Sequence, residues 1–153
     1  MTKTFSISRG SLFNICFACF MVLTASAFTG GLNDEVLRYT NEFRKSKRLP
    51  PLEMLEELNA IARKHSEDMA KGKWSFGHSG YHQRELEVQR AIKMEYGMAE
   101  NVAYGAKTAK EVVTLWKGSS GHRKNMLGNY KYIGIGTARD KHGAIYYTQI
   151  FAR

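Results

Sequence analysis

The sequence predicts an α+β domain in which helices pack on a small antiparallel sheet. Stretches with apolar residues at helical spacing are interleaved with a few short stretches rich in β-branched and aromatic residues. No repeat and no low-complexity linker interrupts these stretches. Helices mixed with few strands are typical of a sheet covered by helices.

The N-terminal segment has the three parts of a secretory signal peptide. A basic start precedes a nearly continuous apolar run at 12–23, and Ala25, Ser26 and Ala27 have the small-x-small form of a cleavage site. The run is shorter than the roughly 20 residues of a membrane-spanning helix, which favours cleavage over a permanent anchor. We therefore predict a signal peptide at 1–27 and one domain at 28–153, secreted to an extracellular or periplasmic location as a monomer.

Removal of this segment changes both the cysteine content and the charge of the chain. Cys16 and Cys19 are the only cysteines, so the mature domain depends on its core rather than on disulfides. Lys3 and Arg9 leave as well, and the net charge falls from +9 to +7. A strongly basic domain favours anionic surroundings such as phospholipid headgroups or acidic wall polymers.

One compact basic cluster, RKSKR at 44–48, stands out from otherwise scattered charges. We expect a salt-sensitive attachment to anionic membranes or wall polymers through Arg44, Lys45, Lys47 and Arg48. The alternative is a solvated helix end, where cations complement the helix dipole. No recognised nucleic-acid motif accompanies the charge, so nucleic acid is not an expected partner.

Apolar periodicity predicts three helices in the first half of the mature chain. The first begins at Asn33 or Asp34, runs to about residue 47 and is broken by the following prolines. The second covers about 54–71 and the third about 83–95. The inward face of the second carries Leu55, Leu58, Ala62, His65 and Met69.

A strand, a helix and a hairpin are predicted in the second half. The strand is MAENVAYG at 98–105. Thr108 and Glu111 have capping-box spacing and open a helix that ends near Gly118. Its inward residues are expected to be Val112, Leu115 and Trp116. Runs at 130–140 and 143–153, rich in β-branched and aromatic residues, form the hairpin.

The predicted strand contains an anomaly, because its alternation places Glu100 on the same face as Met98, Val102 and Tyr104. A partly buried carboxylate is costly unless it is paired or hydrogen-bonded. Glu100 therefore indicates either a structural polar network or a functional site.

Two histidines, His78 in FGHSG and His122 in SSGHRKNML, are the candidates for chemistry. Each lies next to glycine in a loop that bounds an apolar helix, and such loops often carry functional residues. His78 and His82 have the spacing of a helical zinc pair, but Ser79 stands where a zinc-protease motif needs glutamate. We reject that motif.

Two other histidines are expected to have no chemical role. His65 falls on the apolar face of the second predicted helix, which is typical of a hydrogen-bonded core residue. His142 is expected to be exposed at the hairpin tip. No Gly-x-Ser-x-Gly elbow surrounds Ser119 or Ser120, so a serine hydrolase is not favoured.

Seven segments cover nearly all of the mature chain in the order YTNEFRKSKRLPPL, ARKHSEDMAKG, FGHSG, AENVAYG, VVTLWKGSSGHRKNML, YIGIGTA and YYTQIFA. Their order and spacing resemble the CAP superfamily of cysteine-rich secretory, antigen 5 and pathogenesis-related proteins, in its cysteine-free bacterial-type branch. The resemblance implies a secreted α-β-α sandwich. It also implies a central cleft, which in many relatives is lined by two histidines and two acidic residues.

The resemblance matches His78 to the first cleft histidine and Glu100 to the glutamate of the family's GENVA-like motif. Ser119 stands where many eukaryotic relatives carry the second acidic residue, and Tyr146 replaces a histidine. His122 belongs to the SPGHR-like motif of bacterial relatives and is expected to supply the missing imidazole. The expected cleft residues are His78, Glu100, Ser119, His122, Tyr146 and Gln149.

Two function classes follow from these residues. The first is a module that binds lipid or sterol, a membrane surface or a wall polymer. The second is a metal-assisted, peptidase-like hydrolase with His78 or His122 as general base and Glu100 as orienter or metal partner. The sequence shows no nucleophile and no complete zinc ligand set, so we favour binding over enzymatic activity. No cofactor is required, and a divalent metal such as zinc is expected to bind only weakly, through His78 and His122.

Overall fold

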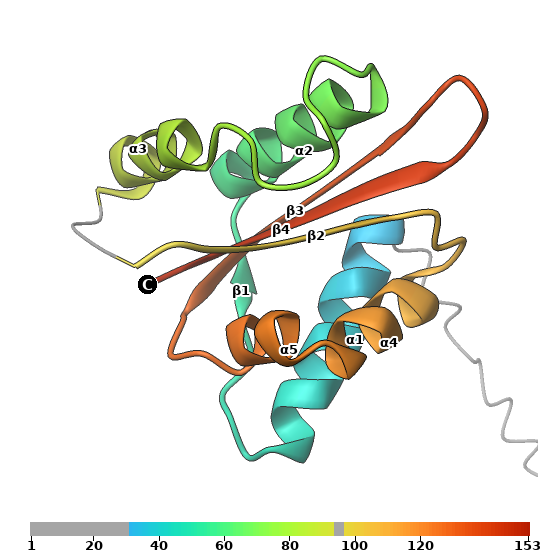
Figure 1. Ribbon diagram of the computed structural model, residues 1–153. Helices are drawn as coiled ribbons and strands as arrows, with labels where there is room; N and C mark the ends of the chain where they lie inside the picture. The colour runs from blue at the N-terminus through green and yellow to red at the C-terminus, as the bar shows by residue number, and fades with distance from the viewer. Residues whose placement is uncertain (1–30, 94–96) are drawn as a thin grey trace, which may run out of the picture.

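A computed structural model describes residues 31–93 and 97–153, with a four-stranded sheet between two layers of helices (Figure 1). In chain order the elements are α1 (Leu32–Ser46), β1 (Glu53–Met54), α2 (Glu56–Ala70), α3 (Tyr81–Ile92), β2 (Ala99–Tyr104), α4 (Ala109–Gly118), α5 (Ser120–Met126), β3 (Tyr132–Arg139) and β4 (Ile145–Ala152). The predicted signal peptide, at 1–27, and the end of the predicted third helix lie outside the described residues. In the described part, no helix is long and apolar enough to cross a membrane.

The sheet has the strand order β1-β3-β4-β2. β3 and β4 form the predicted antiparallel hairpin, with Tyr132 opposite Ala152, and β2 pairs antiparallel with the other side of β4. The two-residue β1 adds a short parallel pairing to β3 that the sequence pattern did not predict. Because β2 lies at one edge of the sheet, segments from both helix layers can meet beside it.

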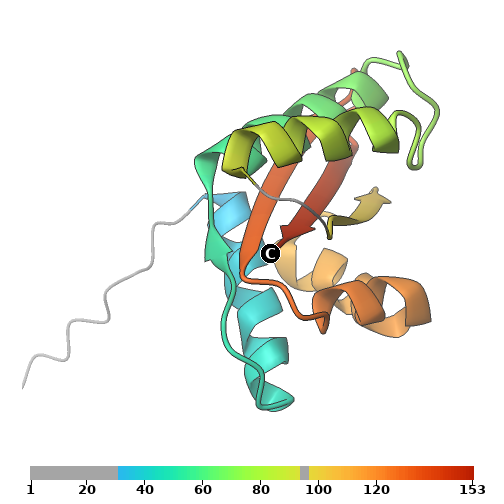
Figure 2. The ribbon, with the colours of Figure 1, turned by 90° about the vertical axis from the view of Figure 1, so that its left-hand side faces the viewer.

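The helices divide between the two faces of the sheet (Figure 2). α2 and α3 lie on one face, and α1, α4 and α5 lie on the other. Each face has its own apolar core. The larger core is formed by residues that include Val36, Phe43, Val112, Trp116, Ile135, Tyr147 and Phe151, and the smaller by Leu58, Ala62, Val88, Met98, Ile150 and Ala152.

The α2 layer sits unusually close to β3 because two strand positions have no side chain. A Cβ atom at Gly134 would overlap the backbone of Leu58, and one at Gly136 would overlap the backbone of Ala62 and Arg63. Backbone cannot rotate away as a flexible side chain can. The two glycines therefore fix the height of α2 above the sheet.

Helix positions agree closely with the sequence pattern except in the α4–α5 region. α4 begins as predicted, with the Glu111 N–H donating to Thr108 Oγ1 at 3.1 Å. Leu115 was predicted to face inward, but it is 54% exposed, and Val113 is buried in its place. The short helix α5 was not predicted, because Gly118 and Ser119 mark a break after which only seven helical residues follow.

The basic cluster at 44–48 is not a uniform surface patch, which corrects the expectation for Arg44. Its guanidinium is buried and donates hydrogen bonds to the carbonyls of Pro50, Met126 and Gly128, each at 2.9 Å. Arg44 thus satisfies backbone groups of the segments that follow α1 and α5. Only the cations at 45, 47 and 48 remain exposed for surface attachment.

The close approach of α2 gives a stability prediction. Gly136→Ala should lower the free energy of unfolding by at least about 2 kcal/mol, because the new methyl group overlaps helix backbone. Urea unfolding measures the change. Gly121→Ala is the matched control, since a Cβ there meets nothing within 4 Å and alanine favours the α5 helix. Equal stability of the two variants would contradict the proposed contact.

Candidate functional site

The site is built around the edge strand β2, whose alternation sends neighbouring side chains to opposite layers. Glu100 points into the α2–α3 layer and is only 4% exposed. Asn101 points into the α1–α5 layer and is fully buried. The anomaly in the sequence is therefore real, and a carboxylate is buried beneath helices.

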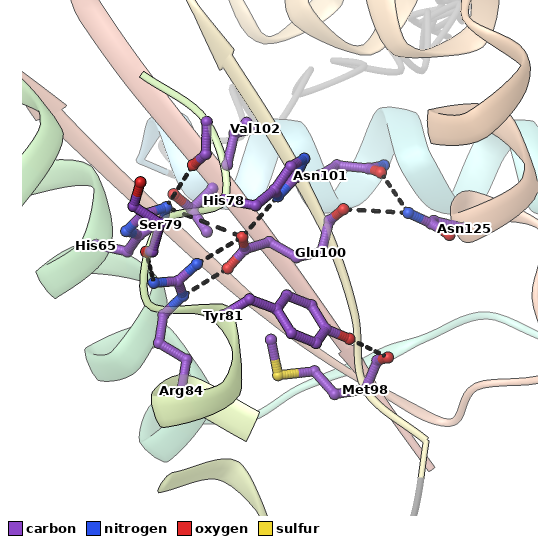
Figure 3. A network of polar contacts seen from close by, with 12 residues as sticks. His65, His78, Ser79, Tyr81, Arg84, Met98, Glu100, Asn101, Val102 and Asn125 are labelled. Atoms are coloured by element: carbon purple, nitrogen blue, oxygen red, sulfur yellow. Dashed lines mark hydrogen bonds and ion pairs between the residues drawn. The ribbon is translucent and has the colours of Figure 1, made fainter. Parts of the chain in front are cut away.

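Arg84, on the first turn of α3, pairs with this carboxylate through two hydrogen bonds (Figure 3). Its Nε donates to Glu100 Oε2 at 2.6 Å, and its Nη2 donates to Oε1 at 2.7 Å. Nη1 of the same guanidinium donates to the Ser79 carbonyl at 2.7 Å. The fork geometry of arginine suits a carboxylate, so the buried charge is balanced and its position is fixed.

His78, in the loop before α3, completes the pair. Its Nδ1 lies 2.8 Å from Glu100 Oε1. A carboxylate only accepts hydrogen bonds, so Nδ1 carries a hydrogen atom and is the donor in this contact. The other ring nitrogen, Nε2, makes no contact with Glu100 and remains available to a ligand. The His78 side chain is 49% exposed, so the buried carboxylate holds an imidazole that is accessible to solvent.

His65, on α2, lies behind this pair and supports the loop. Its Nε2–H donates to the Gly77 carbonyl at 2.9 Å, and its buried Nδ1 has no hydrogen-bond partner. Burial, followed by the nearby Arg84 charge, lowers the pKa of His65, although Glu100 acts in the opposite direction. The prediction of a hydrogen-bonded core histidine is confirmed.

A second polar network lies on the other side of β2, around Asn101. The Asn125 amide donates to the Glu100 carbonyl at 3.1 Å and to Asn101 Oδ1 at 3.0 Å. Asn101 Nδ2 in turn lies 3.2 Å from the His122 carbonyl and from Gln149 Oε1. These contacts join α5 to β2 and β4 and place the His122 segment beside the edge strand.

A recess of about 430 Å³ opens beside this edge, and we call it the His78 pocket. It is lined by His78, Tyr81, Met98, Ala99, Glu100, Lys124, Asn125 and Tyr130. Residues from α3, β2 and α5 thus meet at its wall, and most of them present polar groups. Of the six residues expected in the cleft, His78 and Glu100 line this pocket.

The other four expected cleft residues have different places. His122 is half-buried on α5, where burial and the neighbouring His78 imidazole lower its pKa. Ser119 serves as the N-cap residue of α5. Tyr146 contacts the Tyr104 ring, farther along the Glu100 face of the sheet. Gln149 is fully buried and donates to Thr40 Oγ1 at 2.9 Å, so it does not reach the pocket.

The donor set does not fit a tightly held zinc ion. Arg84 occupies both oxygens of the Glu100 carboxylate, and His78 shares one of them. Within the described residues, no group of three histidine, cysteine or acidic side chains is placed to hold a metal. Two imidazoles without a third protein ligand make at most a weak site. Weak binding through His78 and His122 stays a prediction.

Sequence reasoning missed Arg84, which is the main partner of Glu100. A signal was present, because Arg84 precedes the buried Val88 by four residues and therefore lies on the inward face of the predicted third helix. A buried carboxylate also requires a cation or several donors. Asn101 and Asn125 carried no comparable signal, since their partners are backbone carbonyls and amides brought together only by the fold.

Comparison with known proteins finds one matching family model, that of the cysteine-rich secretory protein family (CAP), over residues 37–151. The chain is 37% identical over 116 residues to uncharacterized protein YkwD of Bacillus subtilis (strain 168), covering 74% of this chain and 45% of YkwD.

Two solved structures share the arrangement of helices and strands. An extracellular protein containing a SCP domain from Bacillus anthracis strain Ames has a TM-score of 0.69 at 28% identity, covering 80% of this chain and 40% of its own. A cysteine-rich secretory protein from Staphylococcus aureus subsp. aureus Mu50 has a TM-score of 0.65 at 26% identity, covering 78% and 37%. This chain therefore spans less than half the length of each of these three relatives.

The buried pair gives a second stability prediction. Glu100→Gln should lower the free energy of unfolding by about 3–5 kcal/mol, because it leaves the buried Arg84 charge without a counter-charge. The double variant Arg84→Met with Glu100→Leu should lose less than Glu100→Gln, since it buries no charge. Urea unfolding compares them. A Glu100→Gln protein as stable as wild type would show that the pair does not support the fold.

The lowered pKa of His65 predicts a loss of stability in acid. The unfolded chain protonates His65 near its ordinary pKa of about 6.5, whereas the folded protein does so only at lower pH. Stability is therefore complete above about pH 6.5 and falls as the pH drops toward the folded-state pKa.

Urea unfolding at a series of pH values tests this expectation. His65→Gln, whose amide can still donate to the Gly77 carbonyl, should show a smaller loss of stability between about pH 7 and pH 5. His122, whose pKa is also lowered, accounts for part of the remaining loss. The exposed His142 provides the control His142→Gln, which should keep the wild-type slope. An unchanged slope in His65→Gln would exclude His65 as the source.

Proposed function

This chain belongs to the cysteine-rich secretory protein (CAP) family, and we propose that it is an exported binding domain whose ligand occupies the His78 pocket. The ligand class that we propose is a polar, anionic component of the cell envelope, either a wall polymer or a phospholipid headgroup. Export is supported by the Bacillus anthracis neighbour, which is described as an extracellular protein.

The observation that carries the proposal is the half-exposed imidazole held by a buried ion pair. Glu100 fixes the Nδ1 side of His78, so Nε2 points away from the carboxylate with little freedom to rotate. A side chain that is already ordered loses less entropy when a ligand binds. His78 is therefore suited to accept a hydrogen bond from a ligand hydroxyl.

The charge and polarity of the pocket support an anionic ligand. Lys124 lies at its rim, and no described carboxylate forms an ion pair with that ammonium group. Asn125 and two tyrosines add further polar groups. A phosphate placed here would meet a free cation, whereas a sterol or acyl chain would cover the Lys124 ammonium group without giving it a partner.

The exposed cations at the end of α1 support a weaker, long-range component of binding. Lys45, Lys47 and Arg48 remain accessible, although Arg44 does not. Attraction between exposed charges is screened by salt. We therefore expect the α1 cations to raise the rate of encounter with an anionic surface, while the His78 pocket provides the specific contacts.

The alternative is the metal-assisted hydrolase with His78 or His122 as general base. The contacts of Glu100 support binding over this alternative, because Arg84 already occupies both carboxylate oxygens. Among the described residues, no hydroxyl side chain is hydrogen-bonded to the His78 ring, so a nucleophile activated by that ring is not in place.

Co-sedimentation tests the proposal with two probes, which are cell-wall sacculi that keep their phosphate polymer and phosphatidylglycerol vesicles. His78→Ala and Lys124→Ala should each weaken binding by about tenfold, because each removes one polar contact to the ligand. Lys110→Ala removes the same charge from exposed α4 and should bind as wild type. Retention on sacculi alone identifies a wall polymer, and retention on vesicles alone identifies a headgroup.

Three results would contradict the proposal. Wild-type binding by both pocket variants would place the ligand elsewhere. Salt-resistant binding to sterol-containing vesicles, unchanged in both variants, would favour an apolar lipid site outside the pocket. Turnover of a peptide library that is lost in both His78→Ala and His122→Ala would favour the hydrolase.

A further inference from the structure

A second recess lies between α2 and α3, which share one face of the sheet (Figure 2), and we call it the Trp74 pocket. It has a volume of about 160 Å³. Its wall includes His65 and Asp68 of α2, Trp74 of the loop that follows, and Glu87 of α3. None of its lining residues also lines the His78 pocket, so the two recesses are separate candidate sites.

His65 brings to the Trp74 pocket a buried acceptor that lacks a donor. Its Nε2 carries the hydrogen atom donated to the Gly77 carbonyl, so Nδ1 has a free lone pair. Nδ1 is buried and has no hydrogen-bond partner among the described residues. Nε2 faces Gly77 and Glu100, and neither residue lines the pocket, so the pocket meets the ring away from Nε2. A ligand that donates a hydrogen bond here would satisfy a group that is otherwise costly to bury.

Burial keeps the His65 ring neutral near neutral pH. Burial, followed by the Arg84 charge, lowers the pKa of His65, while Glu100 acts in the opposite direction. In the neutral ring, the nitrogen without a hydrogen atom is an acceptor. The acceptor therefore remains available to a hydroxyl or N–H group of a ligand.

Trp74 supplies an aromatic wall that the scaffold holds in place. Its backbone N–H donates to the Asp68 carbonyl at 3.3 Å, and that of Lys73 donates to the same carbonyl at 2.9 Å. The ring lies close to Gly80, where an added Cβ would be 3.8 Å from Trp74 Cζ2. Trp74 is 41% exposed, so part of it is open to a ligand. A side chain ordered in this way loses little entropy when a ring stacks on it.

Most charged side chains of the pocket wall are paired with one another. Lys64 Nζ lies 2.8 Å from Asp68 Oδ2, and Lys73 Nζ lies 3.3 Å from the same atom. Arg84, also in the wall, donates two hydrogen bonds to Glu100. Because two lysines share one carboxylate, these pairs leave one positive charge in excess.

Glu87 balances that excess and provides further acceptors. Its carboxylate forms no hydrogen bond and no ion pair with any residue of the described part. The pKa of Lys64 is raised mainly by its hydrogen bond to Asp68, and the Glu87 charge contributes less. Both Glu87 oxygens are therefore available, while the wall as a whole has no net charge to attract an ion.

We propose that the Trp74 pocket binds one ring of a neutral sugar. A cavity of roughly 150 Å³ holds one benzene ring, so the volume suits a single six-membered ring. The apolar C–H face of the sugar stacks on Trp74, and its hydroxyls donate to His65 Nδ1 and Glu87. The inference goes beyond the proposed function, which concerns an anionic ligand in another pocket.

The free acceptors favour a sugar over two other kinds of ligand. An apolar ring would fill the space but would leave His65 Nδ1 without a donor. An organic ammonium ion would pair with Glu87, but it would also meet the three cations of the wall. A neutral ring with hydroxyl groups avoids both costs.

NMR titration with methyl glycosides tests the proposal. Two neutral probes, the glycosides of glucose and N-acetylglucosamine, are compared with the cationic glycoside of glucosamine and the anionic glycoside of glucuronic acid. At least one neutral probe should bind about threefold or more tightly than either charged probe. Its binding should also shift the ¹⁵N resonance of His65 Nδ1, because that nitrogen gains a hydrogen bond.

Variants of the pocket wall should change this binding in different ways. Trp74→Ala removes the stacking surface and should weaken binding of the neutral probe by at least about tenfold, whereas Trp74→Phe should stay within about threefold of wild type. Glu87→Gln keeps an oxygen acceptor and removes the charge, so it should also bind the neutral probe within about threefold of wild type.

Two controls separate this site from other surfaces. Phe76→Ala removes an exposed ring of the same loop that does not line the Trp74 pocket, and it should bind the sugar as wild type. Lys124→Ala alters the His78 pocket and should also leave sugar binding unchanged, so failure of one pocket is distinguishable from failure of the other. Thermal melts check that every variant folds.

Three results would overturn the proposal. The first is the absence of saturable binding by both neutral glycosides. The second is unchanged affinity in the folded Trp74→Ala variant. The third is tightest binding by the cationic glycoside, lost in Glu87→Gln, which would assign the Trp74 pocket to an organic cation.

Discussion

The buried carboxylate of Glu100 must be neutralised, and this requirement determines how α3 and the loop before it pack against β2. Glu100 lies on a strand beneath two helices, where an unpaired charge would be too costly to keep. Arg84 neutralises the carboxylate by donating two hydrogen bonds to it, and it donates a third to the Ser79 carbonyl. A single ion pair thereby fixes α3 against β2 and ties down the loop that carries His78. The orientation of the exposed imidazole is a consequence of a charge that solvent barely reaches.

The same loop depends on the close packing of α2 against the sheet. Without side chains at Gly134 and Gly136, α2 approaches β3 closely enough for its buried polar residues to reach the strands. Ser66 donates to the Gly136 carbonyl at 3.0 Å, and His65 donates to the Gly77 carbonyl. Gly77 directly precedes His78, so this hydrogen bond helps to place a residue of the His78 pocket.

Local pattern was sufficient to predict most of the elements and the buried carboxylate, although it missed β1 and α5. The periodicity of apolar residues located most helices and the hairpin, and it indicated the face of the strand on which Glu100 lies. These features depend on residues that are close together in the chain. Partners were harder to predict, since Arg84 is sixteen residues from Glu100 in the chain. Arg44 shows the opposite error, because a run of cations is normally solvated, yet here its first member donates to three backbone carbonyls. In α4, Val113 faces the core and Leu115 faces solvent, although Leu115 was the residue predicted to face inward.

The edge position of β2 explains why the candidate site combines residues from both helix layers. In the interior of a sheet, the two faces are separated by strands, and side chains above and below cannot meet. At the free edge of β2, Glu100 and His78 approach from the α3 side, while Asn125 approaches from α5 and donates to the Glu100 carbonyl. A ligand in the His78 pocket would therefore contact both layers at once. Its binding would couple α3 to α5 through a strand that, among residues 31–93 and 97–153, has no sheet partner on its outer side. Binding to the folded protein alone would also raise the stability of the native fold.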